Sequence, residues 1–105
     1  MPRSKIDFTA VRYAAQWHVE TLVSRWLPDG RRAGNEWVAR NPNRDDRNPG
    51  SFSVNLTFGA WADFATGDRG SDVVSLAAYL FFSNHDRPQL EAARALSRTL
   101  GLTND

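Results

Sequence analysis

The sequence contains no cysteine among its 105 residues. This absence excludes disulfide bonds, thiolate zinc sites and iron–sulfur clusters, because all three need cysteine sulfur. The two histidines, His18 and His85, each stand alone, without a second histidine at the spacing of a metal site. We therefore expect the chain to fold without a metal ion or another cofactor.

Long apolar runs are absent too, since no stretch approaches the roughly 18 uninterrupted apolar residues of a membrane-spanning helix. Residues 1–6 are basic, but no apolar segment follows them as it does in a secretory signal. We expect a cytoplasmic protein with no membrane partner. A length of 105 residues suits one compact core, so we assign residues 1–105 to a single domain.

Lysine is nearly absent, with one Lys against twelve Arg, although the net charge is only +1. Arginine carries a rigid fork of donors that matches the geometry of phosphate. This preference suits a nucleic-acid partner. Composition alone does not gather the arginines on one surface, and the same preference arises where a chain uses Arg wherever Lys would serve.

The four Trp and six Phe supply large side chains for a core, and apolar residues at helical spacing indicate where helices form. Pro28 and Gly30 end the first pattern, Asp72 is placed to cap the second, and Pro88 to open the third. We expect helices over 7–27 (one long helix, or two short ones broken near Gln16), over 73–82, and from Pro88 to the stop at Gly101.

The middle of the chain has the two-residue alternation of half-buried strands over 36–40, 51–56 and 60–64. Residues 57–59 are short enough to join the last two strands as a hairpin, and the polar run 41–50 predicts a long exposed loop. The predicted fold class is α+β. It comprises a small three-stranded antiparallel sheet, an N-terminal helical segment and two C-terminal helices packed on one sheet face.

Three short motifs follow one another in this region: Asn41-Pro42-Asn43-Arg44, Pro49-Gly50-Ser51-Phe52-Ser53-Val54 and Gly70-Ser71-Asp72. Their order resembles the N-terminal zinc ribbon of bacterial and phage DNA primases. The hallmark of that ribbon is C-P-x-H, then P-S-F-x-V, then C-x-x-C and a Gly-Gly-Asp step into a helix. The resemblance covers residues 30–100, about two thirds of the chain, with one insertion in the second motif.

The zinc ligands of the ribbon have no counterpart in this chain. By the alignment of motifs, the four ligand positions carry Asn41, Arg44, Phe64 and Gly67, a set that cannot hold a tetrahedral zinc ion. Residues 61–72 are similar to segments of primase-helicase and replication proteins on plasmids, phages and integrated elements, some of which also lack the cysteines. The resemblance thus implies a degenerate ribbon without metal.

Because a structural zinc ion supplies folding free energy, something must replace it. We expect the burial of aromatic rings to do so, at about 25 cal/mol per Å² of apolar area. The rings in question are Trp37, Phe52, Trp61 and Phe64.

The resemblance implies DNA binding in the replication or priming of a plasmid, phage or integrated element. Arginines would neutralise phosphates, and exposed aromatic faces would stack on bases, as in proteins that hold single strands or a primer-template. The candidate binding residues are Arg31, Arg32, Arg40, Arg44, Arg47, Arg69, Trp37 and Trp61. The alternative is that these arginines pair with neighbouring carboxylates and that the tryptophans are buried.

A rival function is a protein-interaction module that recruits a separate primase, polymerase or helicase subunit. An exposed apolar patch on the sheet would favour this function, whereas a contiguous arginine face would favour nucleic acid. We do not expect an enzyme, because the catalytic fold of a primase is a separate and larger domain. The loop 67–71 can receive a phosphate at the following helix, but it is more simply a turn whose donors Asp72 occupies.

Overall fold

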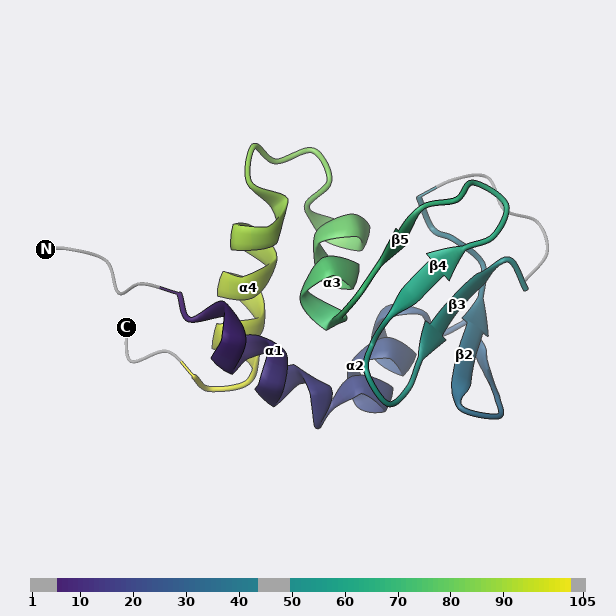
Figure 1. Cartoon of the computed structure of the whole chain (residues 1–105), viewed down its shortest axis with the longest axis horizontal. Coiled ribbons are helices and arrows are strands. Elements are labelled where there is room, and N and C mark those ends of the chain that lie inside the picture. The colour runs from purple at the N-terminus through teal and green to yellow at the C-terminus, as the bar shows by residue number, and fades with distance from the viewer. Residues whose placement is uncertain (1–5, 44–49, 103–105) are drawn as a thin grey trace, which may run out of the picture.

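The computed structural model describes residues 6–43 and 50–102 of the chain (Figure 1). The helices are α1 (Phe8–Gln16), α2 (Val19–Trp26), α3 (Val73–Phe81) and α4 (Pro88–Thr99). The strands are β1 (Arg31–Ala33), β2 (Glu36–Ala39), β3 (Phe52–Asn55), β4 (Trp61–Asp63) and β5 (Arg69–Gly70). The α+β class is thereby confirmed. Of the helices in the described ranges, none has the length and apolar character needed to cross a membrane.

The N-terminal segment forms two helices, which is one of the two arrangements that the sequence allows. Asp7 caps α1 by accepting the Ala10 N–H at 3.1 Å, and the chain turns between Gln16 and Val19 before α2 begins. Asp72 caps α3 as expected, since its carboxylate accepts the Ser75 N–H at 2.8 Å. These caps satisfy backbone donors that a helix start leaves without a partner.

The sheet is an antiparallel meander in the order β1-β2-β3-β4-β5. The prediction of three strands was therefore wrong in number. The three predicted strands are β2, β3 and β4, and the two that were missed are the edges. An edge of three or two residues, Arg-Arg-Ala in β1 and Arg-Gly in β5, is too short to show an alternating pattern.

The sheet has an inner face, which the helices α2 and α3 cover, and an outer face (Figure 1). Buried inner-face residues are Ala39, Phe52, Val54, Trp61 and Asp63. The Trp37 indole N–H donates to the Leu27 carbonyl beyond α2 at 2.9 Å. The Tyr79 ring of α3 lies 4.4 Å from the Trp61 ring, centroid to centroid. These contacts fasten both helices to one side of the sheet.

Helix α4 packs mainly on α3 and α1, and α3 stands between α4 and the sheet (Figure 1). The expectation that both C-terminal helices lie on the sheet face is thus right for α3 and wrong for α4. The buried apolar residues of α4 are Ala92, Ala93 and Leu96. They contribute to a core shared with the neighbouring helices, because Val11 and Ala15 of α1 and Leu76 of α3 are buried in the same cluster.

Candidate nucleic-acid interface

A single row of side chains crosses the outer face from one edge strand to the other. The pairing register joins Arg31 to Val38, Val38 to Ser53, Ser53 to Ala62 and Ala62 to Arg69. Residues paired across strands point to the same face, so an arginine stands at each end of the row, with short side chains between. Four strand spacings of about 4.8 Å separate the two arginine backbones, about 19 Å in all.

A second pair of side chains lies beside this row, on the same face. The alternation of β2 places Glu36 and Val38 outward and, continued beyond the strand, Arg40 as well. Phe64 extends the pairing of β4, because its N–H donates to the Ser51 carbonyl at 2.8 Å. It follows the buried Asp63, and its side chain is 76% exposed. The outer face therefore carries one exposed aromatic ring and three arginines.

The three outer arginines have no bonded partner in the part of the chain that the structure describes. Within residues 6–43 and 50–102, Arg31, Arg40 and Arg69 form no ion pair and no side-chain hydrogen bond. All three are exposed. A guanidinium without a carboxylate partner is available to a phosphate.

Arg32, also a predicted binding residue, does not lie on the outer face but pairs with a carboxylate on α2. It pairs with Trp37 across the strands and so lies toward the inner face, where its guanidinium contacts Glu20 of α2 at 2.7 Å. It also donates to the Gly34 carbonyl at 3.0 Å. Arg32 therefore fastens β1 to α2. Two further predicted residues, Arg44 and Arg47, lie outside the described residues.

Among the described strand residues, Glu36 is the one carboxylate on the outer face, and it accepts hydrogen bonds from Ser53 at 2.7 Å and Asn55 at 3.2 Å. It lies four residues before Arg40 along β2, which corresponds to about 13 Å of extended chain. Glu36 thus lies at one end of the outer face, and Arg40 and Phe64 lie at the other. A polyanion on this face is drawn to the latter end.

Neither predicted tryptophan presents its ring on this face. Trp61 is 6% exposed, and its indole N–H lies 3.2 Å from the Ser75 hydroxyl oxygen, which accepts from it. Trp37 is half-buried, and both residues lie on the inner face beside Val54. Trp61 is part of the core and Trp37 packs against it, so the prediction that these two rings stack on bases was wrong for the outer face. Phe64, which was expected to be buried, is the ring that the sheet exposes.

A polar cluster surrounds the buried side chain of Asn41, the residue that the motif alignment places at the first ligand position. We define the Asn41 cluster as Asn41, Asp63, Asp68 and Tyr79. The Asn41 amide nitrogen donates to the Asp63 carboxylate and to the Tyr79 hydroxyl, at 2.8 Å in each case. The Tyr79 hydroxyl in turn donates to Asp68 at 2.9 Å. Asn41 is 1% and Asp63 0% exposed, so the bond between them is buried, whereas Asp68 and its bond to Tyr79 are exposed.

The Asn41 cluster connects four parts of the fold: the chain after β2, the strand β4, the turn before β5 and the helix α3. Burial raises the pKa of Tyr79 above its ordinary value of 10.0. The hydrogen bond to Asp68 and the charges of Asp68 and Asp63 raise that pKa further, against the opposing bond from Asn41. The hydroxyl therefore keeps its proton at neutral pH and serves as a donor.

The residues at the ribbon's ligand positions do not fit a zinc ion. The Asn41 amide is engaged by Asp63 and Tyr79, Phe64 has an apolar side chain, and Gly67 has none. Among the residues that the structure describes, no group of three or more His, Asp or Glu side chains is placed to hold a metal. Among the described residues, the Asn41 cluster links the chain after β2 to β4 and α3.

No model of a known protein family matches the sequence, and no curated protein matches it. Among solved structures, the chain is similar to the primase of Aquifex aeolicus, in a crystal structure of its zinc-binding and RNA polymerase domains. The TM-score is 0.74 at 20% identity, and the match covers 97% of this chain but 23% of the primase chain. The chain spans about a quarter of the length of that neighbour and has a primase-related fold.

Proposed function

We propose that this chain binds single-stranded DNA across the outer face of its sheet, in the replication or priming of a plasmid, phage or integrated element. The observation that carries the proposal is the row from Arg31 to Arg69, on the face opposite α2 and α3. Its arginines are free of ion pairs within the described part of the chain.

The chemistry of this face suits a single strand. Arg31, Arg40 and Arg69 neutralise phosphates, while the short side chains of Ser53 and Ala62 leave the middle of the face low. The exposed ring of Phe64 offers a surface on which one base stacks, worth about 1–3 kcal/mol. Stacking of this kind needs an unpaired base, so the ring favours a single strand over a duplex. Contacts to phosphate alone do not read the base sequence.

The fold likeness supports a role in replication, because the similar structure is that of a primase with zinc-binding and RNA polymerase domains. The chain corresponds to 23% of that primase. We therefore propose a binding module that holds template beside a polymerase carried by another domain or subunit. We assign no catalytic residue to it.

Amide chemical shifts of the isotope-labelled chain, followed while an oligo-dT is added, test the proposal. Large changes are expected at Arg31, Ser53, Ala62 and Arg69, and small ones on α1 and α4. If the largest changes fall on α1 or α4, or if no amide responds, the outer face is not the binding surface.

A second candidate function rests on α1, at the helical end of the molecule (Figure 1). Tyr13 and Trp17 are 65% and 73% exposed, and their rings meet edge to face with centroids 6.2 Å apart. Exposed aromatic pairs of this kind are typical anchors of protein interfaces. This pair would recruit a primase, polymerase or helicase subunit. Loss of binding to such a purified subunit in a Tyr13→Ser/Trp17→Ser variant tests it, with DNA binding unchanged.

A further inference from the structure

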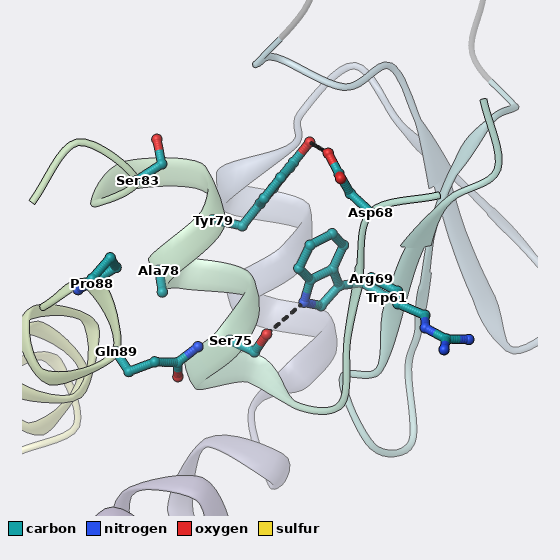
Figure 2. Close-up of a pocket in the computed structure, with 9 residues that line it drawn as sticks. All are labelled: Trp61, Asp68, Arg69, Ser75, Ala78, Tyr79, Ser83, Pro88 and Gln89. Atoms are coloured by element: carbon teal, nitrogen blue, oxygen red, sulfur yellow. Dashed lines mark hydrogen bonds between the residues drawn. The ribbon is translucent and has the colours of Figure 1, made fainter. Parts of the chain in front are cut away.

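A groove of about 350 Å³ runs between β5, one face of α3 and the start of α4 (Figure 2). Its volume is at the lower end of the roughly 300–1,000 Å³ typical of small-molecule sites, which suits one base with its sugar and not a longer segment. The residues that decide its chemistry are Trp61, Asp68, Arg69, Ala78, Tyr79 and Gln89.

Two aromatic residues contribute to the wall of the groove. The rings of Trp61 and Tyr79 line it, and the small side chain of Ala78 leaves space above α3 (Figure 2). Gly70 keeps the β5 wall close to the indole, because a Cβ at this position would collide with the Trp61 nitrogen and with the Ser75 hydroxyl. A base in the groove would contact Tyr79 more than Trp61, because Trp61 is 6% exposed.

Free hydrogen-bonding groups stand at both sides of the groove. Gln89 on α4 has no side-chain hydrogen bond within the described ranges, and Figure 2 shows its carboxamide extended toward α3. On the opposite wall, the Asp63 N–H donates to the Asp68 carbonyl, which makes these two residues a hydrogen-bonded pair. The next pair, Ala62 and Arg69, is then non-hydrogen-bonded, so the Arg69 N–H and C=O point to the free edge of the sheet.

The charges beside the groove favour a base inside it and a phosphate outside it. The Asp68 carboxylate lines the groove and accepts a hydrogen bond from the Tyr79 hydroxyl. Its negative charge repels an anion such as phosphate. The Arg69 guanidinium extends away from Gln89 and Tyr79 (Figure 2), and Arg69 belongs to the outer row. A nucleotide at this edge can therefore keep its phosphate on the outer face at Arg69 while its base turns over the edge into the groove.

We propose that the groove holds one unstacked adenine of the strand that crosses the outer face, so that binding is selective for adenine at one position. This inference rests on the proposed function. Adenine is the base whose N7 acceptor and N6 amino donor match a glutamine carboxamide bidentately. The backbone N–H and C=O of Arg69 offer a second donor and acceptor on the facing wall.

The test compares oligo-dT of about twelve bases with versions that carry a single dA at successive positions. Adenine at one position is expected to strengthen binding about tenfold in fluorescence anisotropy. Gln89→Ala should remove the preference and leave the affinity for oligo-dT unchanged. Gln16→Ala, the same chemical change on the exposed surface of α1, should keep the preference.

Oligo-dT binding without a preference at any position, or with a preference that Gln89→Ala keeps, overturns the adenine site and leaves the proposed function standing. Failure of every oligonucleotide to bind overturns the proposed function instead. In that case the adenine site is tested separately, by adding adenosine alone at millimolar concentration to the labelled chain. Chemical shift changes confined to Arg69, Ala78 and Gln89 support the site, and their absence rejects it.

Discussion

The side-chain amide of Asn41 donates to the carboxylate of Asp63 at 2.8 Å, although 22 residues separate the two along the chain. This bond joins the segment after β2 to the inner face of β4, and Tyr79 extends it to α3. In the primase ribbon that the sequence resembles, the first of these segments carries a zinc ligand. In this chain a hydrogen-bonded cluster and the buried rings of Phe52 and Trp61 connect these segments.

Asn41→Ala is expected to lower the free energy of unfolding by about 2 kcal/mol, because it deprives the buried Asp63 of a donor. Asn84→Ala, in the exposed segment between α3 and α4, is the matched control and should change it by no more than about 0.5 kcal/mol. Urea midpoints with unchanged slopes measure both. Equal midpoints for the two variants would show that the Asn41 cluster does not stabilise the fold.

Thermal unfolding should be the same with and without a strong chelator, since the residues at the ligand positions do not fit zinc. A metal that holds a small fold together contributes its binding free energy to folding, and its removal is readily detected. A lower melting temperature in chelator, restored by added zinc, would contradict the account.

Trp61→Ala is expected to cost about 3–5 kcal/mol of stability, as truncation of a buried aromatic side chain does. The indole packs against Tyr79 and donates its N–H to Ser75. A single substitution of Arg31 or Arg69 should cost no more than about 0.5 kcal/mol. Denaturant midpoints decide the comparison, and a Trp61→Ala midpoint equal to that of the parent would mean that the ring is not part of the core.

Phe64→Ala, unlike Trp61→Ala, is expected to weaken DNA binding and to leave stability nearly unchanged. Its ring is 76% exposed, so stability should change by no more than about 0.5 kcal/mol, while the affinity for oligo-dT should fall by about 1–3 kcal/mol. Phe58, which is 59% exposed at the hairpin turn, is the matched control. If Phe58→Ala weakens binding as much as Phe64→Ala, stacking on the outer face is not the cause.

The raised pKa of Tyr79 predicts a loss of stability at high pH. Its hydroxyl has a higher pKa in the folded protein than the ordinary 10.0, so the proton is held more tightly when the chain is folded. Stability from this group is complete below pH 10 and declines as the pH rises through the folded value. The decline should be smaller in Tyr79→Phe than in the parent and unchanged in Tyr13→Phe. An equal decline in all three proteins would show that Tyr79 is not responsible.

The helices and central strands could be predicted from the sequence, because each is long enough to show its own period and Asp72 and Pro88 mark their starts. The edge strands β1 and β5 could not, since two or three residues acquire their extended form from pairing with a neighbour. The turn between α1 and α2 was predicted only as one of two alternatives. Local patterns thus account for most elements and few of the contacts between them.

The candidate site was only partly predictable, for the same reason. Phe64 was assigned to the core because it is large and aromatic, yet the alternation that buries Trp61 and Asp63 places Ala62 and Phe64 on the other face. Strict use of that period would have exposed Phe64. By contrast, no local signal reveals that Asn41 reaches Tyr79, 38 residues away, or that Arg32 pairs with a carboxylate on α2.

The proposed function requires the outer arginines to hold phosphates, and the salt dependence of oligo-dT binding measures these contacts. The triple variant Arg31→Ala/Arg40→Ala/Arg69→Ala is compared with Arg25→Ala/Arg87→Ala/Arg98→Ala, which removes the same charge from exposed helix and loop positions. Each lost phosphate contact should flatten the slope of log affinity against log salt by about 0.7. The account predicts that the first triple variant flattens the slope by about 2 and the second leaves it near that of the parent. Equal slopes for the two variants would contradict it.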